Sequence, residues 1–141
     1  MSGDFYWASE LANKQFVLLT ADSTGHGVPG AIMSMLNISC INEAVNGQLI
    51  IAPNEILNYT RSKIIKYLSH DGSSEGGKDG MDCSLLSFDF KNKTLTCSSA
   101  NNPVWLVRDL PAGESGKMVL EFAPDKMPVG KHEKDSTPFS E

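Results

Sequence analysis

Two aspartates near the start of the chain are placed where they could bind a metal ion together. Residues 4–8 and 14–22 are typical of the two arms of a β-hairpin that turns around residues 11–13. Paired residues in such a hairpin have a constant index sum, which places Asp4 opposite Asp22. Facing side chains on one sheet face have Cβ atoms roughly 4.5–5.5 Å apart. Two carboxylates that close repel each other unless a cation or a proton lies between them.

This pairing predicts a metal site with oxygen ligands only. Such ligands suit magnesium or manganese better than zinc. The plain alternative is a pair of solvated aspartates at the end of two strands, and the facing positions favour the metal site over it.

A glycine-rich loop follows directly from the second arm, over Asp22-Ser23-Thr24-Gly25-His26-Gly27. A strand end followed by glycines and a helix start exposes backbone N–H groups and carbonyls. Such a corner can bind an anion or add a carbonyl to a cation site. No Gly-Lys-Ser/Thr follows, so the loop is not a nucleotide-binding P-loop. His26 is either a general acid or a residue that holds the loop by hydrogen bonds, and the structural role is slightly favoured.

Two further acids, Asp79 and Asp82, flank the start of a strand. Turn formation at Asp79-Gly80 is the simpler interpretation. The alternative is that these acids contact the metal ligands without binding the metal themselves. Residues 100–103 read most naturally as a hairpin corner. The chain has no Gly-x-Ser-x-Gly motif and no cysteine with an evident histidine partner, so the sequence does not predict a protein nucleophile.

Length, composition and charge define the class of protein. The chain has 141 residues, 40% of them hydrophobic and 21% charged, which is typical of one globular domain. A net charge of −5 argues against nucleic acid and anionic membranes as partners. No apolar run approaches the roughly 20 residues of a membrane span, and the first residues do not resemble a signal peptide. Three cysteines without a Cys-x-x-Cys motif favour the reducing cytoplasm.

The elements that must position the aspartates follow the order β-β-α-α-β-β-β-β. This order predicts an α+β domain, with antiparallel sheet covered by an antiparallel helix pair. The helices are expected over residues 29–45 and 53–69, and later strands over 81–90, 94–100, 104–108 and 118–122. Residues 71–80 are expected to form a flexible loop and residues 131–141 a loose tail.

The apolar pattern predicts which faces are buried. The first helix is expected to bury Ala31, Met35, Ile38 and Val45, with Ile32, Leu36 and Ile41 widening the stripe. The second is expected to bury Ile56, Leu57, Thr60, Ile64, Tyr67 and Leu68. The continuous apolar run Phe16-Val17-Leu18-Leu19 predicts a strand covered on both faces.

Five segments together resemble a known family. In order, they are SGDFYW, ADSTGHGVPGAIMSML, DGMD, SSANNPVWLVR and PDKMPVG. The sequence resembles the SpoIIE/RsbU-type serine phosphatases, a bacterial branch of the metal-dependent 2C-like (PPM) protein phosphatases, over almost its whole length. The resemblance implies an α-β-β-α sandwich with two manganese or magnesium ions between the sheets. It also implies hydrolysis of phosphoserine or phosphothreonine on a small regulatory protein, by attack of metal-bound hydroxide on phosphorus, in a protein with an upstream sensor domain.

The resemblance also assigns roles to single residues. Asp4 matches the first metal aspartate, Asp22 matches the second, which touches both ions, and Ser23 falls where a backbone carbonyl completes the site. Asp4 and Asp22 are therefore the expected catalytic and metal residues. Apart from the resemblance, Gly25, His26, Asp79 and Asp82 remain candidates for contacts that support these residues without binding the metal themselves.

The sequence departs from the family pattern at both ends. Family domains have a strand before the Ser-Gly-Asp motif, and continue through a Thr-Asp-Gly or Ser-Asp-Gly motif that supplies a further metal aspartate. We therefore expect residues 1–141 to be a truncated phosphatase domain that binds at most one manganese weakly, has negligible activity and self-associates through unpaired sheet edges. A catalytically silent phosphatase-like binding or scaffold module is the alternative, and a purely structural α+β domain ranks last.

Overall fold

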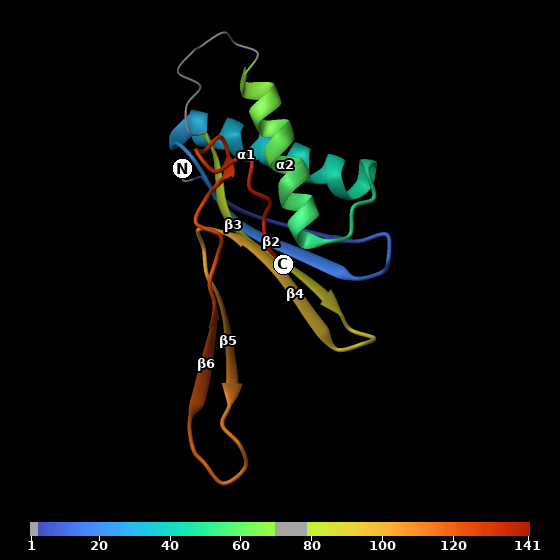
Figure 1. Ribbon diagram of the computed structural model, residues 1–141, viewed down its shortest axis with the longest axis vertical. Helices are drawn as coiled ribbons and strands as arrows, with labels where there is room; N and C mark the ends of the chain where they lie inside the picture. Colours follow the sequence, from blue (N-terminus) through green and yellow to red (C-terminus); the bar gives the residue numbers. More distant parts are fainter. Residues whose placement is uncertain (1–2, 70–78) are drawn as a thin grey trace.

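The computed structural model describes residues 3–69 and 79–141. Two helices cover one face of a five-stranded antiparallel sheet, and a two-stranded hairpin extends away from it (Figure 1). This arrangement confirms the predicted α+β class. The predicted loop over 71–80 lies outside the described residues except at its last two positions.

The main sheet contains the strands that carry the candidate site. Its order is β1 (Asp4–Glu10), β2 (Phe16–Ser23), β3 (Gly80–Asp89) and β4 (Thr94–Ala100), and the short β7 (Val129–Gly130) also pairs with β3. The first four match the predicted strands closely. The two residues of β7 are too few to give a sequence signal, and their pairing depends on the contact between Gly80 and Gly130.

The two helices begin and end near the expected residues. Helix α1 (Gly27–Asn42) continues into one π-helical turn, η1 (Glu43–Gly47), which ends two residues beyond the predicted helix over 29–45. Helix α2 (Pro53–Leu68) begins with a proline, whose fixed φ and missing N–H suit the first helical turn. Neither helix in the part of the chain described here is long and apolar enough to cross a membrane.

The buried face of α1 agrees with the predicted stripe only in part: Ile41 is buried as predicted, and so is Val45 in the π-helical turn. The residues that α1 buries are Gly30, Met33, Asn37, Cys40 and Ile41. Ile32 and Met35 are 60% and 72% exposed. Apolar residues occur on all sides of this helix, so their spacing alone does not predict which side is buried. By contrast, α2 buries Ile56, Leu57, Thr60 and Ile64 as predicted, together with Arg61, while Tyr67 is exposed.

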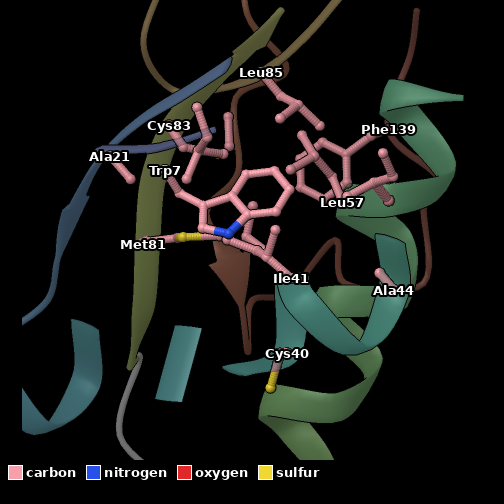
Figure 2. Packing of buried hydrophobic residues seen from close by; sticks show 14 of the residues in the cluster. Trp7, Ala21, Cys40, Ile41, Ala44, Leu57, Met81, Cys83, Leu85 and Phe139 are labelled. Atoms are coloured by element: carbon pink, nitrogen blue, oxygen red, sulfur yellow. The ribbon is translucent and has the colours of Figure 1, made fainter. Parts of the chain in front are cut away.

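The core lies between the helices and one face of the sheet. Trp7, Leu19, Met81 and Leu85 supply the sheet side, and the Trp7 indole points into the cluster (Figure 2). Each large side chain buried here contributes roughly 1.5–3 kcal/mol. Burial raises the pKa of the Cys83 thiol to about 12, so this cysteine stays protonated and packs as an apolar group.

The other face of the sheet is not covered by the described residues. Val17 and Leu19 are buried, but Phe16 is exposed and Leu18 is half-buried, so the predicted two-sided cover of this run is wrong for the described part of the chain. Strands β5 (Val104–Asp109) and β6 (Lys117–Phe122) form the protruding hairpin seen in Figure 1. An apolar groove of about 660 Å³ lies between this hairpin and the ends of β3 and β4.

The end of the chain is anchored, in contrast to the predicted loose tail over residues 131–141. Phe139 is 2% exposed and belongs to the core cluster. Its N–H donates to Asn58 Oδ1 over 2.9 Å, and the Arg61 guanidinium lies 4.7 Å from the centre of its ring. Arg61 Nη2 also donates to the Thr137 carbonyl over 2.8 Å. The low apolar content of residues 131–141 led to the wrong prediction, because a single aromatic ring, that of Phe139, packs this segment against the core.

Candidate metal centre at the end of the sheet

Three aspartates lie in one row across neighbouring strands. Asp4 of β1 pairs with Asp22 of β2, which confirms the pairing deduced from the hairpin, and Asp22 also pairs with Asp82 of β3. Side chains alternate along a strand, and Ala21 and Ser23 are buried on the helix side of β2. The three carboxylates therefore lie on the opposite, uncovered face. Asp4 and Asp22 are exposed there, and Asp82 is half-buried.

The electrostatics of the row disfavour a charged Asp22. The pKa of Asp22 is raised by partial loss of hydration first, then by the charge of Asp4 and a hydrogen bond with it, and finally by the charge of Asp82. An acid whose pKa is raised on folding stabilises the folded state at low pH and loses that contribution as pH rises. The folded chain thus holds carboxylates together against their repulsion.

Loss of hydration and this repulsion together predict that Asp22→Asn raises the melting temperature of the metal-free chain. The difference from wild type should be absent well below pH 3.8, the ordinary pKa of an aspartate, should grow as pH rises from there through the raised pKa, and should then stay constant. Thermal melts followed by circular dichroism between pH 3 and 7 would measure it.

Asp89→Asn is the matched control with the opposite sign. Hydrogen bonds from Asn92 lower the pKa of Asp89, so its charged form stabilises the fold, and its removal should lower the melting temperature at pH 7. If both substitutions shift stability in the same direction, repulsion within the row is not the cause.

The donors fit a hard divalent cation by their chemistry, because all are oxygens and the charges are negative. Their number is small. Among residues 3–69 and 79–141, no three His, Cys, Asp or Glu side chains converge closely enough to enclose an ion. The row is thus suited to a cation but does not surround one.

Ser23 ends β2 beside the two facing carboxylates. It is buried, and its N–H donates to the Gly3 carbonyl over 3.1 Å. A Cβ atom on Gly3 would lie 2.2 Å from the Ser23 carbonyl oxygen and 3.1 Å from Asp22 Oδ1. Only glycine permits residue 3 to approach both the Ser23 carbonyl, which is the predicted backbone ligand, and the Asp22 carboxylate this closely.

Asp82 has a partner that the sequence did not reveal. Its Oδ1 accepts a hydrogen bond from Asn101 Nδ2 over 2.8 Å. Asn101 has φ 59°, in the left-handed region that asparagine tolerates better than most residues. The predicted hairpin corner over residues 100–103 is wrong, because β4 and the strand that follows it pair with different neighbours. The sequence also gave no signal that the Asn101 amide turns back toward Asp82.

Asp79 has a different role from Asp82. Its Oδ1 accepts from Thr24 Oγ1 over 3.2 Å, and the Thr24 N–H donates to the Gly80 carbonyl over 3.0 Å. Asp79 therefore fastens the glycine-rich loop to the start of β3, outside the row of aspartates.

Gly25 and His26 form the turn into α1. Gly25 has φ +90°, a conformation that strains other residues. His26 is the N-cap residue with extended backbone, and its exposed side chain makes no capping hydrogen bond.

Comparison with solved structures places the fold among PP2C-type domains. The SiaA-PP2C domain of Pseudomonas aeruginosa is 29% identical, with a TM-score of 0.74 over 92% of this chain and 47% of that one. A Stage II sporulation E family protein from Thermanaerovibrio acidaminovorans is 12% identical, with a TM-score of 0.58 over 80% of this chain and 52% of that one. The RsbU and RsbW domains of Rv1364c from Mycobacterium tuberculosis are 18% identical, with a TM-score of 0.57 over 89% and 37%.

The sequence then defines the family within this class. Residues 12–139 match the Stage II sporulation protein E (SpoIIE) model, and the chain belongs to this family. No curated protein sequence matches significantly. The chain spans about half or less of the solved structures it resembles. Asp22, Ser23 and Asp82 lie within the family match, whereas Asp4 precedes it and is linked to the site by its register with Asp22.

Proposed function

We propose that this chain is part of a metal-dependent protein phosphatase that hydrolyses phosphoserine or phosphothreonine in bacterial signalling. The observation that carries the proposal is the register of Asp4 opposite Asp22, with Asp82 next in the row. Membership of the SpoIIE family supports the reaction class. A row of carboxylates at a strand end supplies oxygen ligands, which fit hard cations such as Mn²⁺ or Mg²⁺.

Each residue of the site has a defined task in this proposal. Asp4 and Asp22 hold the cations, and the Ser23 carbonyl adds a neutral oxygen ligand. Asp82, fixed by Asn101, adds negative charge beside Asp22. Bound divalent ions supply a water of lowered pKa and neutralise charge on the phosphoryl oxygens. In this proposal the protein side chains orient the ions, and no side chain acts as a covalent nucleophile.

We propose the partners and the location from the family resemblance and the composition of the chain. The substrate is a small regulatory phosphoprotein, an upstream sensor domain controls the activity, and the protein acts in the cytoplasm. The outer edge of β1 has no strand partner within residues 3–69 and 79–141, and we propose that the isolated chain self-associates through such edges.

A catalytically silent binding module is the second candidate. It is favoured by the lack of three converging metal-binding side chains among the described residues. A row that never binds metal would serve only as an acidic surface.

Titration of the 141-residue chain with Mn²⁺ separates these two candidates. We expect at most one ion to bind weakly, because each hard cation requires about six oxygens and this chain supplies few of them. Isothermal titration calorimetry would measure the affinity, and a phosphate-release assay on a phosphoserine peptide should show negligible turnover. The matched control is Asp22→Asn, which should bind no Mn²⁺.

Two results would contradict these expectations in different ways. Tight binding of two ions with rapid turnover would support the reaction but would mean that other residues of this chain complete the site. Identical Mn²⁺ binding by wild type and Asp22→Asn would mean that the row is not a metal site.

A further inference from the structure

A buried polar cluster joins helix α1 to the strand ends that carry the facing aspartates. Asn37 is 0% exposed, and its Nδ2 donates to Ser23 Oγ over 2.9 Å. One turn earlier in the helix, Ser34 Oγ lies 3.0 Å from the Gly3 carbonyl and 3.1 Å from Ser23 Oγ. Two side chains of α1 therefore contact the residues adjacent to Asp4 and Asp22.

Asparagine at position 37 reduces the stability of the fold. Its Oδ1 is buried and has no hydrogen-bond partner in the described part of the chain. A buried acceptor without a partner reduces stability, whereas an apolar residue of similar shape avoids this loss. Met33, Cys40 and Ile41 are buried on the same face, so the helix neighbours of a leucine at this position would be largely apolar. The donation from Nδ2 to Ser23 is thus the property that asparagine adds here.

Ser34 extends this contact to the other strand end. Its single hydroxyl proton can be donated to one acceptor at a time, and the Gly3 and Gly30 carbonyls both lie within 3.0 Å. Since the Ser23 N–H also donates to the Gly3 carbonyl, the two strand ends and α1 form one connected network. A shift of Ser23 would change the approach of its carbonyl to Gly3 and to the Asp22 carboxylate.

We propose that Asn37 and Ser34 are positioning residues, which hold Gly3 and Ser23 so that Asp4 and Asp22 face each other at the separation a cation needs. The geometry of the candidate metal centre is then set by α1 and not by strand pairing alone. This inference rests on the proposed function for its consequence in metal binding, but its structural part can be measured without metal.

The first test measures amide hydrogen exchange by NMR in the metal-free chain. In Asn37→Leu, the Ser23 amide should exchange at least about tenfold faster relative to the amides of residues 17–19 in the middle of β2, because its strand end opens locally. The matched control is Thr60→Val in α2, since Thr60 is equally buried and its Oγ1 also has no partner in the described part of the chain. That variant should leave the Ser23 amide unchanged relative to the same reference.

The second test measures Mn²⁺ affinity by electron paramagnetic resonance. Asn37→Leu should weaken binding about 10- to 100-fold, the range for residues that orient metal ligands, while Thr60→Val should bind as wild type does. Ser34→Ala should act in the same direction, and Ser34→Thr, which keeps a hydroxyl, should restore binding. If Asn37→Leu does not fold, Ser34→Ala takes its place in both tests because it removes only one hydroxyl.

The outcomes separate this inference from the proposed function. Unchanged relative exchange at Ser23 overturns the inference, whether or not the chain binds Mn²⁺. Faster exchange with unchanged Mn²⁺ affinity also overturns it. If wild type itself binds no Mn²⁺, the proposed function fails, while faster exchange at Ser23 would still show that α1 holds the strand ends.

Discussion

Replacing Asp22 with alanine in a protein that contains the complete phosphatase domain should lower phosphate release at least about a hundredfold. A loss of this size is typical when a single group that stabilises transition-state charge is removed. Asp22 lies between Asp4 and Asp82 in the row, so without it the two remaining carboxylates are on strands that are not neighbours. Release of phosphate from a phosphoserine substrate at saturating Mn²⁺ would measure the effect.

Glu10→Ala is the control for this substitution. Glu10 is an exposed acid at the far end of β1, paired with Phe16, so its removal changes the net charge equally without touching the row. We expect it to retain activity. Turnover by Asp22→Ala near the level of Glu10→Ala would rule out the proposed role of the row.

The second large effect is on stability. Phe139→Ala should reduce the free energy of unfolding by about 3–5 kcal/mol, as for other fully buried aromatic side chains. The ring is buried in the core and lies beneath the Arg61 guanidinium, so its loss leaves a cavity and removes the cation–π contact. This is a large fraction of the roughly 5–15 kcal/mol that stabilises a typical domain.

Urea unfolding of Phe139→Ala beside Phe90→Ala would test this docking of the chain end. Phe90 is 73% exposed, so removing its ring should change stability by less than about 0.5 kcal/mol. Equal losses in the two variants would show that Phe139 does not pack in the core in solution.

The register of the candidate site could be predicted from the sequence because it follows from local geometry. A hairpin with a short turn fixes which residues face each other, so Asp4 and Asp22 could be paired without knowledge of the rest of the fold. The apolar stripe of α2 was equally informative, since its polar residues lie mainly on the other side.

Features that depend on distant contacts could not be predicted in this way. The buried face of α1 contains Asn37, whose partner Ser23 is known only once the helix is docked. Likewise, Asn101 reaches Asp82, and Phe139 reaches the core, through folding of segments far apart in the chain. Apolar periodicity predicts that a face is buried but not which residues it contacts. The positions of Asn37, Asn101 and Phe139 depend on contacts with particular residues.

The order of the strands also has a kinetic consequence. Asp4 and Asp22 come together when a local hairpin closes, but Asp22 meets Asp82 only after both helices between β2 and β3 are accommodated. Closing this long loop is entropically costly, and such non-local pairings slow folding. The last carboxylate thus joins the row at the slow step. A divalent ion that binds the finished row would stabilise it, but it would speed this step only if the row is already formed in the transition state for folding.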